Sequence, residues 1–212
     1  GISDEKRAEA ASPRTIPDGS IVSIGVDAAK TRDTTAVGWA WVDPDTGECF
    51  VDCHVWSCRP GVACDTFVTG GRLDNDDARD YVRDVLLEDF NGRLVFYDER
   101  YFGTQAMDLS QDGLTVVEMH QGKPEMVAAW NEFYADLHGA RPLVRIRKGM
   151  PGRTLVSHIK AAKGKRNAAG DSWKVHKEDL PIDALAAVVM ARYAARHFGE
   201  YVRSRERWAI VR

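Results

Sequence analysis

The stretch Ile21-Val22-Ser23-Ile24-Gly25-Val26-Asp27 is followed by a polar turn and then by a second apolar run, Ala36-Val37-Gly38-Trp39-Ala40-Trp41-Val42. Two such runs, rich in β-branched and aromatic residues and joined by a short polar segment, predict a β-hairpin. Asp27 ends the first strand, so a strand packed on the core would hold its carboxylate rigidly, as a functional group requires. An aspartate at this position also commonly starts a turn, so position alone leaves both interpretations open.

The pattern after this hairpin predicts one α/β domain. The turn Asp43-Pro44-Asp45-Thr46-Gly47 leads into a third strand, and strands then alternate with helices. The predicted strands are 20–27, 35–42, 48–56, 94–98 and 114–119, with a short one at 143–146; the predicted helices are 75–90, 102–110, 123–138, 153–163 and 180–197, the last with Pro181 in its first turn; residues 164–172 are expected to be a mobile loop. We expect a mixed sheet of five or slightly more strands, in the order 3-2-1-4-5, with helices on both faces. The domain is predicted to span 19–199, with a linker or tail at 1–18 and a C-terminal tail at 200–212.

Length and composition are those of an ordinary soluble globular domain. The chain has 212 residues and a formal net charge of −3, and we expect no signal peptide. No apolar run approaches the roughly 20 residues that cross a bilayer, so no membrane partner is expected. The cysteines are Cys49, Cys53, Cys58 and Cys64. Their spacing matches neither paired zinc knuckles nor a small disulfide scaffold, so we interpret them as reduced thiols, with a zinc site as the alternative.

Charge is distributed unevenly along the chain. Between residues 141 and 177 the only acid is Asp171, among eleven lysines and arginines. So one-sided a segment predicts a surface that contacts a polyanion such as DNA. The candidate DNA-binding residues are Arg145, Arg147, Lys148, Arg153, Lys160, Lys163, Lys165, Arg166 and Lys177.

Three carboxylates stand at the ends of predicted elements: Asp27, Asp98 after the fourth strand, and Asp183 in the first turn of the last helix. In the order 3-2-1-4-5 the first and fourth strands are neighbours, so Asp27 and Asp98 would lie side by side, and a helix across the sheet could bring Asp183 to the same rim. Converging carboxylates repel one another unless a cation neutralises them, and hard divalent ions prefer oxygen ligands. Two ions roughly 3.5–4 Å apart can activate a water and stabilise the leaving oxygen in phosphodiester cleavage.

Other interpretations of these acids stay open. Asp98 could be a turn residue, and Asp183 could complement the helix dipole. Asp179 competes with Asp183 as the third metal ligand. Asp33, in the hairpin turn, either fixes the turn or lies just outside the metal ligands.

The motifs together resemble the nuclease half of phage terminase large subunits. The resemblance covers about residues 20–198 in the correct order; its segments are Gly25-Val26-Asp27, Asp33-Thr34-Thr35-Ala36, Phe96-Tyr97-Asp98, Gln121-Gly122 with Met126, Leu155 with His158, Ala161-Ala162, and Ile182-Asp183-Ala184-Leu185-Ala186. The resemblance implies a ribonuclease H-like fold and metal-dependent cleavage of double-stranded DNA during genome packaging. It also implies that Asp27, Asp98 and Asp183 bind Mg²⁺ or Mn²⁺ and that Lys177 contacts the scissile phosphate.

The resemblance also implies partners: double-stranded DNA, an ATPase motor domain, a small terminase subunit and a portal, in the host cell cytoplasm. The sequence lacks G-x-x-x-x-G-K-[ST], so either the motor lies upstream of this segment or the chain is a stand-alone nuclease. Because the sequence begins without Met, we favour a motor upstream. The alternatives within the fold are a resolvase- or transposase-type nuclease and a non-catalytic DNA or motor docking module. A sugar-kinase or actin-like ATPase is disfavoured because no glycine-rich phosphate hairpin follows Asp98.

Overall fold

The computed structural model describes residues 11–12, 15–30, 33–147, 150–166, 173–176 and 180–202. Its main sheet begins with an antiparallel meander, β2 (Ser23–Asp27), β3 (Thr34–Val42) and β4 (Cys49–Ser57), and continues with the parallel strands β6 (Leu94–Tyr97) and β7 (Thr115–Glu118). The path β4-β3-β2-β6-β7 is the predicted order 3-2-1-4-5, which is therefore confirmed. Beyond β4 the sheet adds β8 (Val144–Arg147) and β1 (Ala11–Ser12), and β5 (Thr66–Phe67) also pairs with β4.

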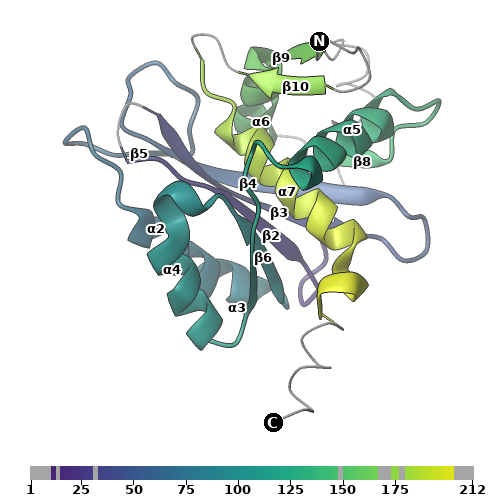
Figure 1. Ribbon diagram of the computed structural model, residues 1–212, viewed down its shortest axis with the longest axis horizontal. Helices are drawn as coiled ribbons and strands as arrows, with labels where there is room; N and C mark the ends of the chain where they lie inside the picture. Colours follow the sequence, from purple (N-terminus) through teal and green to yellow (C-terminus); the bar gives the residue numbers. More distant parts are fainter. Residues whose placement is uncertain are drawn as a thin grey trace.

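Helices cover both faces of this sheet, as Figure 1 shows. One face carries α2 (Asn75–Tyr81), η1 (Val82–Leu86), α3 (Leu87–Asp89) and α4 (Glu99–Gln111); the other carries α5 (Pro124–His138), α6 (Met150–Ala161) and α7 (Asp183–Arg196). Two apolar clusters fill the spaces between the sheet and these layers. Because side chains alternate along a strand, Ile24 and Val26 of β2 pack in the cluster on the α2 and α4 face, while Gly25 faces α7 on the other side.

Helix α7 crosses the middle of the sheet over β2 and β3 (Figure 1) and is almost entirely buried. Its buried face is rich in alanine, and the strands beneath it present Gly25, Ala36, Gly38 and Ala40. Small residues on both sides let the helix backbone lie directly on the sheet. On its outer side, Arg192 makes ion pairs with Glu132 and Asp136 of α5, which join the two helices.

Several predicted boundaries were wrong. The predicted helix 75–90 is helical from Asn75 to Asp89, and its middle turn, η1, is π-helical between α2 and α3. Helix α7 begins at Asp183 because the backbone of Ile182 (φ −123°, ψ 10°) is not helical, so Pro181 precedes the helix instead of lying in its first turn. Strand β9 (Lys163–Arg166) spans the end of the predicted helix 153–163 and the start of the predicted loop 164–172, and it pairs antiparallel with β10 (Trp173–His176), which was not predicted. Val175 of β10 packs against the apolar cluster beneath α5, α6 and α7, a tertiary contact that a single apolar residue does not reveal in the sequence. Residues 167–172 lie outside the described ranges.

The two tail segments contain short regular structure where they are described. Residues 11–12 form β1, and residues 198–202 are helical. All four cysteines are free, and burial raises the pKa of the Cys49 thiol to about 12, which keeps it protonated. Within the described ranges, none of the helices combines the length and the apolar character that crossing a membrane requires.

Candidate active site

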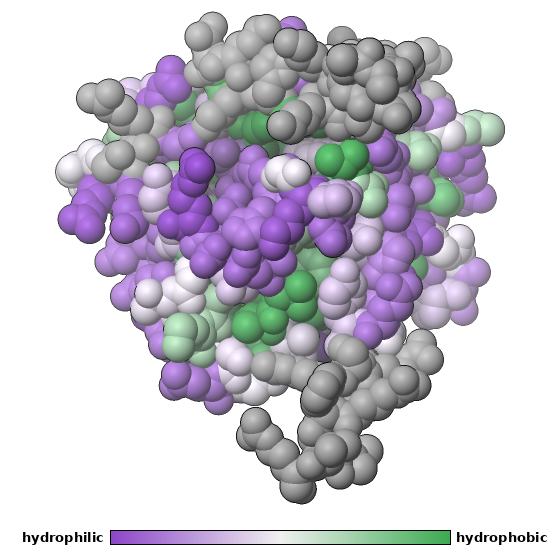
Figure 2. Space-filling view, viewed as in Figure 1, coloured by the Kyte–Doolittle hydropathy of each residue, from purple (hydrophilic) through white to green (hydrophobic). Residues whose placement is uncertain are grey.

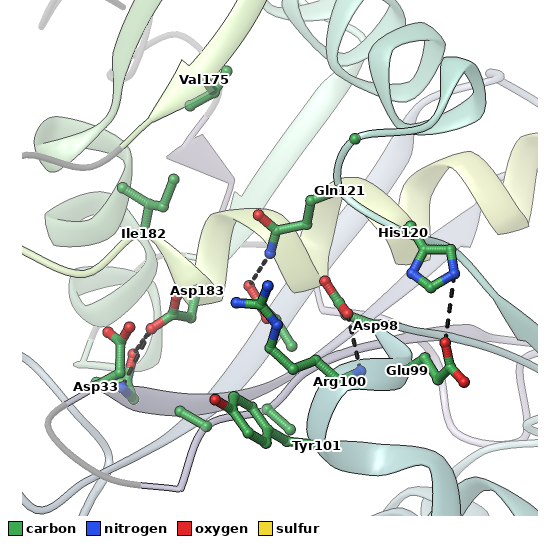
Figure 3. Close-up of a pocket in the computed structure, with 15 residues that line it drawn as sticks. Asp33, Asp98, Glu99, Arg100, Tyr101, His120, Gln121, Val175, Ile182 and Asp183 are labelled. Carbon is green, nitrogen blue, oxygen red and sulfur yellow. Dashed lines mark hydrogen bonds and ion pairs between the residues drawn. The ribbon is translucent and has the colours of Figure 1, made fainter.

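The three predicted carboxylates line one pocket of about 740 Å³ at the rim of the sheet. Asp27 comes from the end of β2, Asp98 from the start of α4 and Asp183 from the start of α7, so the pocket draws on segments far apart in the sequence. Asp33 lines it as well, and Figure 3 shows Asp33 beside Asp183 on one side of the pocket and Asp98 on the other. The surface over the space between α4 and α7 is largely hydrophilic in Figure 2.

Strand pairing places Asp27 and Asp98 next to each other in the sheet. Val26 pairs with Tyr97, and the backbone N–H of Asp98 donates to the carbonyl oxygen of Val26 at 3.2 Å. The Asp98 carboxylate accepts a hydrogen bond from the backbone N–H of Arg100 and caps helix α4. Asp98 therefore both starts a helix, close to the turn role left open by the sequence, and lines the pocket. Asp27 is only 7% exposed and accepts a hydrogen bond from the Gln121 side-chain amide at 3.1 Å.

Asp183 is held from the opposite side by the first residue of β3. The Thr34 hydroxyl donates to one Asp183 carboxylate oxygen, and the Thr34 backbone N–H donates to the same oxygen at 3.3 Å. Asp183 is 7% exposed, so these donors are part of what stabilises its carboxylate away from water. The contact fixes the direction of the Asp183 side chain relative to the strand hairpin that carries Asp27.

Thr34→Val is expected to remove the hydroxyl donor while keeping the shape of the side chain. A hydrogen bond to a charged group contributes about 1.5–3 kcal/mol, so unfolding in urea should begin at lower denaturant concentration. Groups that orient metal ligands typically change metal affinity about 10–100-fold, so Mn²⁺ affinity measured by calorimetry should fall by about tenfold. Thr46→Val is the control, since Thr46 lies in the β3–β4 turn at the other end of the strand. An unchanged Mn²⁺ affinity in Thr34→Val would contradict this role.

His158 lies behind the pocket instead of in it. Its side chain is 1% exposed, and burial lowers its pKa. The imidazole Nδ1 accepts from the backbone N–H of Ala184 at 3.2 Å, and Nε2 lies 3.2 Å from the carbonyl oxygen of Ala63. The histidine therefore contacts the residue after Asp183 and not the pocket itself.

Of the predicted DNA-binding residues that the structure describes, none is among the residues lining the pocket. Arg145 forms an ion pair with Glu48 at 2.7 Å, and Arg147 with Asp52 at 3.3 Å; both line a separate cavity of about 290 Å³. The Arg145 guanidinium, with that of Arg141, lowers the Glu48 pKa. Contact with DNA stays a prediction for both arginines, which already form ion pairs with Glu48, just before β4, and with Asp52 on β4. Three of the remaining predicted site residues are exposed: Arg153 and Lys160 on α6, and Lys163 on β9. For Lys165 and Arg166 only the backbone, in β9, is described. Lys148, Lys177 and Asp179 lie outside the described residues.

Other pocket residues were not predicted as site residues. Arg100 extends its side chain into the middle of the pocket in Figure 3, and Tyr101 lies at its mouth with the Lys30 ammonium 5.6 Å from its ring centroid. Their place two and three residues after Asp98 was the available signal. At the other edge, Glu99, Glu118 and His120 have potential ligand atoms within 4.8 Å of one another. Glu99 and His120 line the pocket, whereas Glu118 is not among its lining residues and has the Lys123 ammonium 3.8 Å from its carboxylate.

Comparison with solved structures identifies the arrangement. Over 92% of its length the chain superposes on the large terminase of bacteriophage HK97 with a TM-score of 0.71 at 20% identity. The chain has the fold of large-terminase nuclease domains. It covers only 43% of the HK97 chain. It also matches the large-terminase nuclease of thermophilic phage G20c with bound magnesium (TM-score 0.57, 16% identity, 92% of this chain and 96% of that one).

A further match is the large-terminase nuclease domain of bacteriophage SPP1 with bound Mn, with a TM-score of 0.52 at 14% identity, over 90% of each chain. No protein-family model and no curated protein sequence matches the chain. These comparisons confirm the predicted ribonuclease H-like, terminase-nuclease fold. At these identities the agreement concerns the fold, so the activity has to be inferred from the chain's own residues.

Proposed function

We propose that this domain is a metal-dependent endonuclease that cleaves double-stranded DNA with little sequence specificity, as the nuclease part of a viral DNA-packaging terminase. The observation that carries the proposal is that Asp27, Asp98 and Asp183, from three elements of a terminase-nuclease fold, line the same pocket. Because the sequence identities to solved terminases are low, the shared fold supports the proposal but does not establish the activity. The argument for DNA cleavage therefore depends on the three carboxylates.

The residues of the pocket fit hard divalent cations. Asp27 and Asp183 are both nearly buried, and carboxylates in such places favour a compensating cation. Carboxylate oxygen is the ligand that Mg²⁺ and Mn²⁺ prefer, and solved neighbours of this fold were obtained with one or the other. When bound, two such ions would supply an activated water and stabilisation of the leaving oxygen. Asp27, Asp98 and Asp183 would hold them, and Asp179 is the alternative third ligand.

The chain's own residues have distinct roles in this proposal. Gln121 orients the carboxylate of Asp27, and Thr34 orients that of Asp183. Arg100 is placed to contact a phosphate oxygen of DNA that enters the pocket. We further propose that Lys177 contacts the scissile phosphate and that the exposed residues Arg153, Lys160 and Lys163 follow the DNA backbone, with Lys148, Lys165 and Arg166. Contacts of this kind position DNA without reading sequence.

The remaining partners follow from the same proposal. In addition to double-stranded DNA, they are an ATPase motor domain preceding this segment, a small terminase subunit and a portal, in the cytoplasm of the host cell. The described residues contain no second site that favours a different function as specifically as the carboxylate pocket does.

Purified protein is expected to nick and linearise supercoiled plasmid when Mn²⁺ or Mg²⁺ is added, and to stop when EDTA removes the metal. Gel electrophoresis of plasmids with unrelated sequences should show cutting of each. Two comparisons separate the alternatives. A resolvase would cut a branched junction in preference to linear duplex. A docking module would not cut DNA, whichever metal ion is added. Intact plasmid in Mn²⁺ at every protein concentration would contradict the nuclease proposal.

A further inference from the structure

Helix α7 starts without the side-chain cap that helices usually have. The first N–H groups of a helix have no partner inside it, and they are commonly satisfied by an oxygen of the preceding residue. Here the preceding residue is Ile182, which makes no capping hydrogen bond. Asp183 and Ala184 are the first two residues of the helix, so any loosening of this turn moves the Asp183 carboxylate directly.

His158, on the neighbouring helix α6, supplies the missing acceptor. Its Nδ1 lies 3.2 Å from the Ala184 nitrogen, which can only donate, so Nδ1 carries no proton. Its Nε2 lies 3.2 Å from the Ala63 carbonyl oxygen, which can only accept, so the proton is on Nε2. The two partners therefore select one neutral tautomer, and both ring nitrogens are used.

The segment that carries Ala63, the partner of the His158 Nε2, is itself held in place. Thr154, one helical turn before His158, donates to the Asp65 carboxylate at 3.1 Å, and the same carboxylate accepts from the Val55 N–H of β4 at 2.9 Å. The loop that carries Ala63 is thus attached to the central sheet through Asp65. Leu155 and Ile159 of α6 are buried in the core, which orients this side of the helix towards α7.

We propose that His158 is a positioning residue for the metal site: by capping α7 at Ala184 it holds the first turn of the helix, and with it the Asp183 carboxylate, in the geometry that binds the divalent ion. The inference rests on the proposed function, because it assigns Asp183 as a metal ligand. It explains the spacing of Leu155 and His158, which places one residue in the core and the other under the helix end. His158 itself contacts neither DNA nor metal.

Two substitutions of His158 separate its two hydrogen bonds. The Oδ1 of asparagine can take the place of Nδ1 and accept from Ala184, whereas the Nε2 of glutamine can donate to Ala63 but leaves Ala184 without an acceptor. His158→Asn should therefore keep most of the parent's Mn²⁺ affinity and cutting rate. His158→Gln and His158→Ala should lose about 10–100-fold in both, the usual effect of removing a group that orients a metal ligand. Ser157→Ala, on the same helix, is the matched control.

Three readouts are measured on each variant: amide hydrogen exchange of Ala184 by NMR, Mn²⁺ affinity by calorimetry, and cutting rate per folded molecule. Exchange of the Ala184 amide should accelerate in the Gln and Ala variants and stay slow in the Asn variant. Equal exchange, Mn²⁺ affinity and cutting rate in all variants would overturn the proposal. Losses of affinity and cutting that are the same in His158→Asn and His158→Gln, and that are explained by a smaller folded fraction, would also overturn it. If the parent fails to cut plasmid, the nuclease proposal fails, and the positioning role is decided by Ala184 exchange together with Mn²⁺ affinity.

Discussion

Gly25→Ala is expected to destabilise the domain by more than about 3 kcal/mol, the upper part of the usual range for overpacking a core. A Cβ atom at this position would lie 2.1 Å from the carbonyl oxygen of Ala187 and 2.8 Å from the nitrogen of Ala191. Both are backbone atoms of α7, so no side-chain rotation relieves the clash, and the helix itself would have to move. Since domains of this kind are stable by about 5–15 kcal/mol, the shift in the urea midpoint should be large.

Gly103→Ala is the matched control for this experiment. Gly103 lies inside helix α4, and a Cβ there would meet nothing within 4 Å. Glycine inside a helix is less favourable than alanine by roughly 0.5–1 kcal/mol, so this variant should be slightly more stable than the parent. Gly38→Ala should behave like Gly25→Ala, because its Cβ would lie 2.7 Å from the Val188 nitrogen. A Gly25→Ala protein as stable as the parent would mean that α7 does not lie on the sheet as described.

Asp27→Asn and Asp183→Asn are each expected to reduce Mn²⁺-dependent cutting by more than about 100-fold. Groups that merely orient ligands cost about 10–100-fold, and loss of a charged ligand should exceed this. Both variants should stay folded, because the asparagine oxygen can still accept from Gln121 or from Thr34. The plasmid assay under conditions in which the parent is linearised measures the loss, and circular dichroism checks the fold.

The matched control is Asp45→Asn, an exposed aspartate in the β3–β4 turn at the end of the strand opposite Thr34. It should cut at the parent's rate. Full activity in Asp27→Asn or Asp183→Asn would remove the corresponding carboxylate from the proposed reaction. Loss of activity in Asp45→Asn as well would indicate a general effect of charge on DNA binding instead of a metal site.

The sheet order and the shared pocket could be predicted from sequence because both depend on local patterns. The apolar runs define the strands, and Asp27, Asp98 and Asp183 each stand at an end of an element, where the topology brings them to one rim. The ends of elements were predicted less well. Helix α4 starts directly after Asp98 because that residue caps it, a contact that apolar periodicity does not reveal.

Contacts across long sequence separations could not be predicted. Thr34 contacts Asp183 across 149 residues of sequence, and no local pattern pairs a threonine at the start of a strand with an acid in a distant helix. The close approach of α7 to Gly25 likewise depends on tertiary packing. Charge clustering in the sequence did not reveal that Arg145 forms an ion pair with Glu48 and Arg147 with Asp52.

Crystals soaked in Mn²⁺ test the central claim most directly, because anomalous scattering locates the ion independently of any activity. The account predicts Mn²⁺ in the pocket at the rim of the sheet, with oxygens of Asp27, Asp98 and Asp183 within about 2.0–2.6 Å of a cation, the range of metal–oxygen distances for hard ions. Manganese bound elsewhere, with these three carboxylates free of it at saturating concentration, would contradict the account.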